Sequence, residues 1–102
     1  YKFVACDTIK TVGTSLQGKV TTTYDKLVEV FGEPTMTDAS PYEKVNAQWS
    51  VNAEDENNTT FTIYNWKDGY VPTEEYEWHI GGFDFNAYCV ATDILDNAKE
   101  IV

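Results

Sequence analysis

His79 is the only histidine in the chain, and it lies between Trp78 and the pair Gly81-Gly82. A histidine can act as a general base, bind a metal, or sit as a polar residue on the outer face of a strand. Nucleophilic catalysis would also need an activated serine or cysteine, and the chain carries no nucleophile-elbow pattern or other catalytic signature. We therefore interpret His79 first as an outer-face strand residue, second as a contact to a ligand or partner, and last as a catalytic group.

A metal site is not predicted from the residues. Zinc is held by three or four ligands, with histidine and cysteine at characteristic spacings. Besides the single histidine only Cys6 and Cys89 are available, and neither is close to it in sequence. The cysteines are interpreted as reduced, structural thiols, with Cys89 on the apolar side of a helix, and a disulfide is left open. Neither an enzyme nor a cofactor is predicted.

Carboxylates dominate the chemistry of the chain. Seventeen acidic residues stand against seven lysines, with no arginine, and the formal net charge is −10. Eleven of the acids and only two of the lysines fall in residues 52–102. Phosphates would repel such a chain, so direct nucleic-acid binding is excluded, and attraction to a basic protein surface is the converse possibility. For the charge by itself, the preferred interpretation is that the acids only keep the surface solvated.

The length and composition fit one folded domain over residues 1–102. The apolar content of 42% is sufficient for a globular core. No apolar run approaches the length of a membrane span, and the N-terminus lacks the apolar core of a signal peptide. The oligomeric state cannot be predicted from these features.

Two helices would frame the candidate residues. The spacing of Tyr24, Leu27, Val28 and Phe31 predicts a helix within residues 22–34. Its expected signals are a capping box formed by Thr22 and Asp25, and a stop at Gly32. A second helix is predicted from Asp84, its N-cap, onward. Its apolar side is expected to carry Phe85, Tyr88, Cys89, Thr92 and Leu95.

Alternating and β-branched residues predict strands over residues 44–51, 59–66 and 76–80, with Gly81-Gly82 ending the third. Phe61 and Ile63 should face the core, with Tyr64 and Trp66 on the other face. Residues 2–6 and 14–20 are further strand candidates, the latter an edge strand with a close approach at Gly18. The predicted fold class is α+β, a single domain. Its antiparallel sheet would have three to five strands, with two helices packed on one face.

Several motifs in order resemble a family of small phage-encoded hypothetical proteins. They are GTSLQG, TYDKLVEVFGEP, the strand with Trp49, TIYNWK and EWHIGG, and the resemblance covers residues 12–82. It implies a viral protein that acts in the host bacterial cytoplasm, and it implies no mechanism. In that setting, small acidic proteins resemble counter-defence inhibitors, some of which mimic DNA.

Two functions are carried forward. The first is a non-enzymatic inhibitor that binds a basic surface of a host nucleic-acid-binding protein through acids and exposed aromatic rings. Its contact residues would be Glu54, Asp55, Glu56, Tyr64, Trp66, Tyr70, Glu74, Glu75 and Glu77.

The second function is the binding of a small nucleotide-type ligand, with rings stacking on a base and a lysine at the phosphate. It requires Trp66 and His79 to lie on the same side of the sheet. Its residues would be Gly13, Thr14, Ser15, Gln17, Gly18, Tyr64, Trp66, Lys67, Trp78, His79, Gly81 and Gly82.

Overall fold

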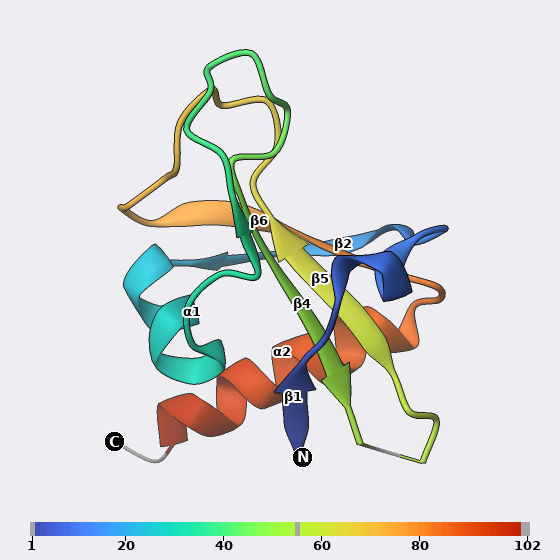
Figure 1. Ribbon diagram of the computed structural model, residues 1–102. Helices are drawn as coiled ribbons and strands as arrows, with labels where there is room; N and C mark the ends of the chain where they lie inside the picture. Colours follow the sequence, from blue (N-terminus) through green and yellow to red (C-terminus); the bar gives the residue numbers. More distant parts are fainter. Residues whose placement is uncertain (1, 55, 101–102) are drawn as a thin grey trace.

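The computed structural model describes residues 2–54 and 56–100. Along the chain the elements are β1 (Phe3–Ala5), the 3-10 helix η1 (Thr8–Thr11), β2 (Ser15–Thr22), α1 (Tyr24–Phe31), β3 (Met36–Thr37), β4 (Ala47–Ala53), β5 (Thr60–Tyr64), β6 (Tyr76–Gly82) and α2 (Asn86–Glu100) (Figure 1). No helix in this part of the chain is long and apolar enough to cross a membrane.

In the described residues, six strands form one antiparallel sheet in the order β1-β4-β5-β6-β2, with β3 also paired to β4. The α+β class, the antiparallel sheet and the two helices are confirmed. The sheet has one strand more than the predicted maximum of five. The additional strand is β3, which is only two residues long and so has no periodicity to read.

The core lies on the face of the sheet that carries Trp49 and Trp78. Both indoles are buried, and their ring centroids lie 5.4 Å apart in an edge-to-face arrangement. Phe61, Ile63 and Ile80 are also fully buried. The alternation predicted for β4, β5 and β6 is therefore confirmed at these positions.

Helix α1 begins one residue later than the predicted capping box implies. The N-cap is Thr23, whose hydroxyl accepts a hydrogen bond from the Lys26 amide, while Thr22 is the last residue of β2. Gly32 ends the helix with a positive φ of 84°, as the sequence predicts. The Phe31 ring contacts Phe61 at a centroid distance of 5.8 Å, which holds the end of the helix on the core.

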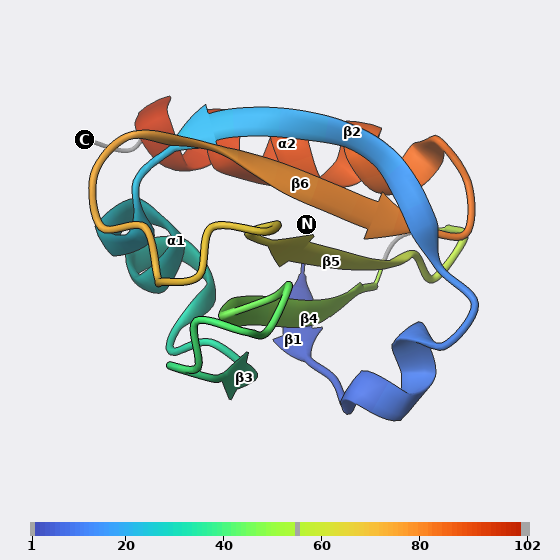
Figure 2. The ribbon, with the colours of Figure 1, turned by 90° about the horizontal axis from the view of Figure 1, so that it is seen from above.

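Helix α2 packs against β6, β2 and β5, whereas α1 lies beside the sheet (Figures 1 and 2). The predicted packing of both helices on one face is therefore not clearly present, although the Tyr24 and Phe31 rings of α1 also contact core residues. The predicted apolar side of α2 is wrong at Phe85 and Cys89, which are exposed, and correct at Leu95, which is buried. Cys6 and Cys89 are both free thiols. The side that is buried consists of Ala87, Val90, Ala91, Ile94 and Leu95.

Glycines explain how α2 approaches the sheet. The prediction that the strand stops before Gly81 and Gly82 is wrong. Both glycines belong to β6, and each pairs with the neighbouring strands on both sides. A Cβ on Gly82 would overlap that of Ala87, and a Cβ on Gly18 would overlap the Tyr88 ring. The small residues let the helix lie close to β6 and β2. The predicted edge strand with a close approach at Gly18 is thereby confirmed.

Candidate functional site

Three aromatic rings gather on the outer face of the sheet, opposite the core. Tyr64 and His79 are cross-strand partners, and their rings stack at a centroid distance of 5.4 Å and an interplanar angle of 27°. The Trp66 ring lies 6.2 Å from that of Tyr64 and 6.5 Å from that of His79. We call Tyr64, Trp66 and His79 the ring cluster. Trp66 and His79 thus lie on the same side of the sheet, as the ligand hypothesis requires.

The imidazole of His79 is held by packing. Its Nδ1 atom is closed off from solvent and has no hydrogen-bond partner in the part of the chain that the structure describes. Burial lowers the pKa of His79 below its ordinary 6.5, and the charge of Lys19 lowers it further, while Asp68 and Glu77 act in the opposite direction. The ring is therefore mainly neutral at pH 7 and offers a flat, uncharged stacking surface.

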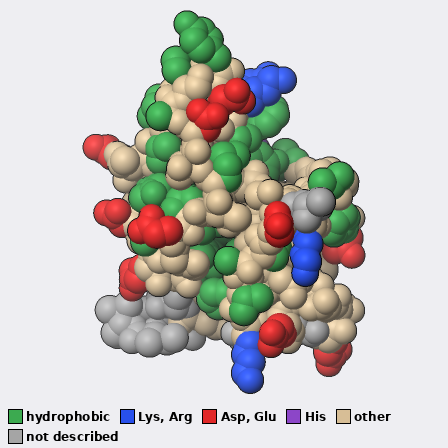
Figure 3. Space-filling view, in the orientation of Figure 1, with side chains coloured by type: hydrophobic (Ala, Val, Ile, Leu, Met, Phe, Trp, Pro, Cys, Tyr) green, Lys and Arg blue, Asp and Glu red, His purple; other side chains and the backbone are tan. Residues whose placement is uncertain are grey.

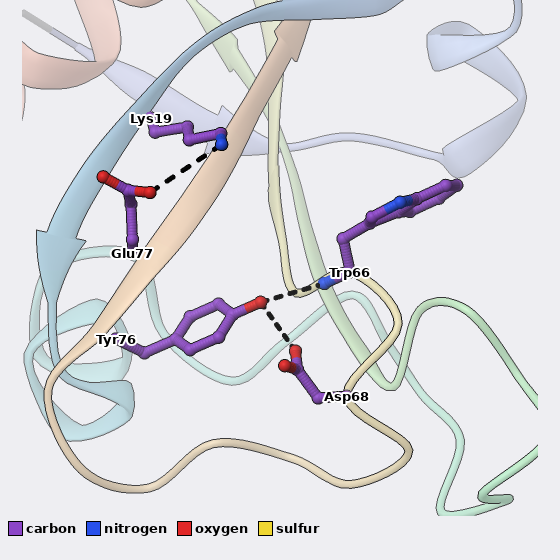
Figure 4. Close-up of polar contacts among 5 residues, drawn as sticks. All are labelled: Lys19, Trp66, Asp68, Tyr76 and Glu77. Carbon is purple, nitrogen blue, oxygen red and sulfur yellow. Dashed lines mark hydrogen bonds and ion pairs between the residues drawn. The ribbon is translucent and has the colours of Figure 1, made fainter.

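Lysines surround the ring cluster. Lys19 is the cross-strand partner of His79 on β2, and its Nζ lies 3.7 Å from Glu77 (Figure 4). The Nζ atoms of Lys44 and Lys67 each lie 5.8 Å from the centroid of the Trp66 ring, within cation–π range. A strongly acidic chain thus places several of its few lysines around one group of rings.

A second candidate surface lies at one end of the sheet. The loop over residues 38–46 and the loop over residues 65–75 lie side by side at the top of Figure 1. Tyr42 is 93% exposed in the first loop and Tyr70 is 64% exposed in the second. Figure 3 shows hydrophobic, acidic and lysine side chains next to one another at this end. We define the loop-end surface as Tyr42, Glu43, Tyr70, Glu74 and Glu75.

Buried polar contacts tie the two loops together. The amide group of Asn65 donates to the side-chain oxygen of Asn46 at 3.0 Å, and both residues are fully buried. The Tyr76 hydroxyl donates to Asp68 at 2.6 Å and accepts from the Trp66 amide at 3.2 Å (Figure 4). Burial and the Asp68 carboxylate raise the pKa of Tyr76 to about 12. The exposed rings therefore stand on a rigid base.

The acidic residues of the inhibitor hypothesis fall into separate places. Glu74 and Glu75 belong to the loop-end surface, and Glu77 lies on the outer face beside Lys19. Glu54 and Glu56 follow β4 in the turn that leads to β5, at the opposite end of the sheet (Figure 1). Asp55 is outside the described residues. The structure therefore does not unite the predicted acids in one patch.

The residues of the ligand hypothesis are brought together only in part. Tyr64, Trp66, Lys67 and His79 are close, and Gly81 lies beneath the Tyr64 ring. The others do not join them: Trp78 faces the core, and the remaining members lie along β2, before it, or against α2. These remaining members are Gly13, Thr14, Ser15, Gln17, Gly18 and Gly82.

Sequence reasoning missed Lys19, Lys44, Tyr42 and the buried asparagines. Lys19 follows directly on the GTSLQG motif, but its place beside His79 depends on the pairing of β2 with β6. Tyr42 carries a local signal, since it follows Pro41 in a turn-rich stretch where an aromatic residue has no core to face.

No group of three or more histidine, cysteine, aspartate or glutamate side chains in residues 2–54 and 56–100 could hold a metal ion. No protein-family model matches the chain, and comparisons with curated proteins and with solved structures found no match. Its function must therefore be inferred from its own residues.

Proposed function

We propose that this protein is a non-enzymatic binding protein that attaches to a basic surface of a partner protein through its loop-end surface. The observation that carries the proposal is that Tyr42 and Tyr70 stay exposed on two loops joined by the buried Asn46–Asn65 pair. Large exposed rings on a fixed backbone are typical of the anchors that carry most of the binding energy of an interface. A preformed loop also loses little conformational entropy when it binds.

The charge of this end favours a basic partner. Glu43, Glu74 and Glu75 are exposed in the two loops that carry the tyrosines, and they outnumber the exposed Lys44 and Lys67 of the same loops. Complementary charge raises the rate of encounter and selects among partners more than it adds affinity. Glu54 and Glu56 lie at the far end of the sheet. We therefore propose that the loop-end surface binds the partner by itself, and that the carboxylates of residues 52–102 do not together imitate the phosphates of DNA.

The biological setting of this proposal follows from the resemblance to phage proteins. The partner would be a host protein with a groove built for nucleic acid, in the bacterial cytoplasm. Covering that groove would inhibit the partner, which is the role proposed for the protein. The missing arginines and the net charge of −10 support this choice over direct binding of nucleic acid.

The test is capture of host proteins from a bacterial lysate on the immobilised protein, at low and at high salt. A loop-end variant, Glu43→Gln/Glu74→Gln/Glu75→Gln, removes three charges at the proposed interface. A far-end variant, Glu54→Gln/Asp55→Asn/Glu56→Gln, removes three charges elsewhere and serves as the matched control. We expect one partner to be retained by the wild type and the far-end variant at low salt, released at high salt, and lost with the loop-end variant.

Equal loss of the partner with both variants would contradict the loop-end assignment and favour a charge array over the whole acidic half. Retention by both would show that the acids only solubilise the protein. For both variants, the circular dichroism spectrum and the thermal midpoint of unfolding should match those of the wild type. The reason is that the substituted residues that the structure describes are all exposed.

A further inference from the structure

We propose that the ring cluster is a binding site for a nucleotide, with the base on the rings and the phosphate at Lys44 and Lys67. This site adjoins the loop-end surface, because Tyr42 and Glu43 line the hollow beside Lys44 and Lys67, but it does not depend on the proposed partner. The described part of the chain contains three tryptophans. Trp49 and Trp78 are buried, whereas Trp66 is 40% exposed and is the one whose indole a ligand can reach. The arrangement joins two features that a nucleotide needs, an exposed indole beside two further rings and two lysines whose Nζ atoms lie 5.8 Å from the centroid of that indole.

The stacking surface is already assembled. Each ring of the cluster lies within 6.5 Å of the other two, and Tyr64 and His79 are stacked across neighbouring strands. Tyr64 and His79 lie on strands, which fix their positions more firmly than a loop would, and Trp66 follows two residues after β5. Stacking of a base on aromatic side chains is tolerant of base identity, because every base has a π-face. The neutral imidazole adds surface without adding charge.

The cations have a place for a phosphate beside them. Lys44 and Lys67 both approach the Trp66 ring, and the Lys67 amide donates to the Lys44 carbonyl at 2.7 Å. Both lysines also line a shallow hollow of about 300 Å³ together with Tyr42, Glu43 and Asp68. Two like charges held on one ring repel each other, and an anion between them would relieve that repulsion. A phosphate attached to a stacked base would reach this hollow.

The negative net charge of the chain disfavours a long anionic ligand and permits a small one. A long nucleic-acid strand would meet the net charge of −10 along its length and be repelled. For a single nucleotide, salt screens the more distant carboxylates beyond about 8–10 Å, so the nearby lysines dominate. The site therefore suits a mononucleotide rather than a strand.

The test is isothermal titration calorimetry with AMP, adenosine and inorganic phosphate as separate probes, at about 0.15 M salt and without added metal. We expect saturable AMP binding, with adenosine and phosphate each about tenfold weaker, because each supplies only one half of the contacts. Trp66→Ala should weaken AMP binding roughly tenfold, since it removes the exposed stacking ring. Lys44→Gln/Lys67→Gln should weaken AMP about tenfold and leave adenosine unchanged.

A matched control is Lys2→Gln/Lys26→Gln, which removes two lysines outside the ring cluster and should bind AMP as the wild type does. The double variant Glu74→Gln/Glu75→Gln, which changes loop-end residues outside the hollow, should also keep AMP binding, and this separates the site from the proposed partner surface. Absence of saturable AMP binding would overturn the proposal. So would adenosine binding as tightly as AMP, or an equal loss in the lysine control.

Discussion

Asn46 and Asn65 are both fully buried and hydrogen-bonded to each other, although 19 positions separate them in the chain. The side-chain oxygen of Asn65 accepts from the amides of Asn46 and Ala47 at 2.7 and 3.0 Å. The amide group of Asn46 donates in turn to the carbonyls of Asp38 and Ser40. One pair of side chains thus satisfies backbone groups in both loops that carry the loop-end surface.

Asn65→Ala should lower the free energy of unfolding by about 2–4 kcal/mol, because it leaves at least two buried amides without an acceptor. Urea denaturation gives that quantity, and amide hydrogen exchange at Ala47 should become faster. Asn57→Ala, at an exposed turn position, is the control and should change stability by less than about 0.5 kcal/mol. A loss as small as the control's would mean that the pair does not hold the loops.

Gly82→Ala should destabilise the protein by about 1–3 kcal/mol, because the added Cβ would overlap that of Ala87 and push α2 away from β6. The same change made together with Ala87→Gly removes the overlap. The double variant should therefore be more stable than the sum of the two single losses implies, as measured in a double-mutant cycle by urea denaturation. Additive losses would show that Gly82 is needed for another reason.

The strand faces could be predicted from the sequence because a strand's periodicity is a local property. Trp78 and His79 alternate between core and outer face, as the residues on either side of them indicate. The face of α2 could not be predicted in the same way. Ala87 packs against Gly82 of β6 and the Tyr88 ring packs against Gly18 of β2, and these contacts between distant positions are not visible in the local pattern of the helix.

The candidate surfaces depended on contacts between distant parts of the chain. A pattern of polar residues places Asn46 and Asn65 in solvent, and their burial is possible only because each satisfies the other. Lys19 likewise meets His79 only through the pairing of β2 with β6. Trp66 was identified correctly as exposed, and Tyr64, Lys67 and His79 were correctly placed near it. Its neighbour Lys44 was not predicted, since it comes from another loop.

Tyr76→Phe should lose about 1 kcal/mol of stability at pH 7, because it removes the hydroxyl that links Asp68 to the Trp66 amide. The pKa of Tyr76 is about 12 in the folded protein against the ordinary tyrosine value of 10.0, so the unfolded chain loses this proton first as the pH rises. The contribution is complete below pH 10 and is lost between pH 10 and 12. The stability difference between wild type and variant should shrink over that range in urea titrations, and a constant difference would contradict the assignment.

The imidazole of His79 should titrate with a midpoint below 6.5, because burial and Lys19 outweigh the opposing charges of Asp68 and Glu77. As the pH falls, the unfolded chain takes up this proton before the folded protein does, so stability decreases from pH 6.5 down to the folded midpoint. The chain has one histidine, so its ring proton is unambiguous in a proton NMR titration. Lys19→Gln should raise the midpoint, whereas Lys26→Gln, on α1, should not. A midpoint at or above 6.5 would show that the ring is solvated and that the ring cluster is not packed as the structure has it.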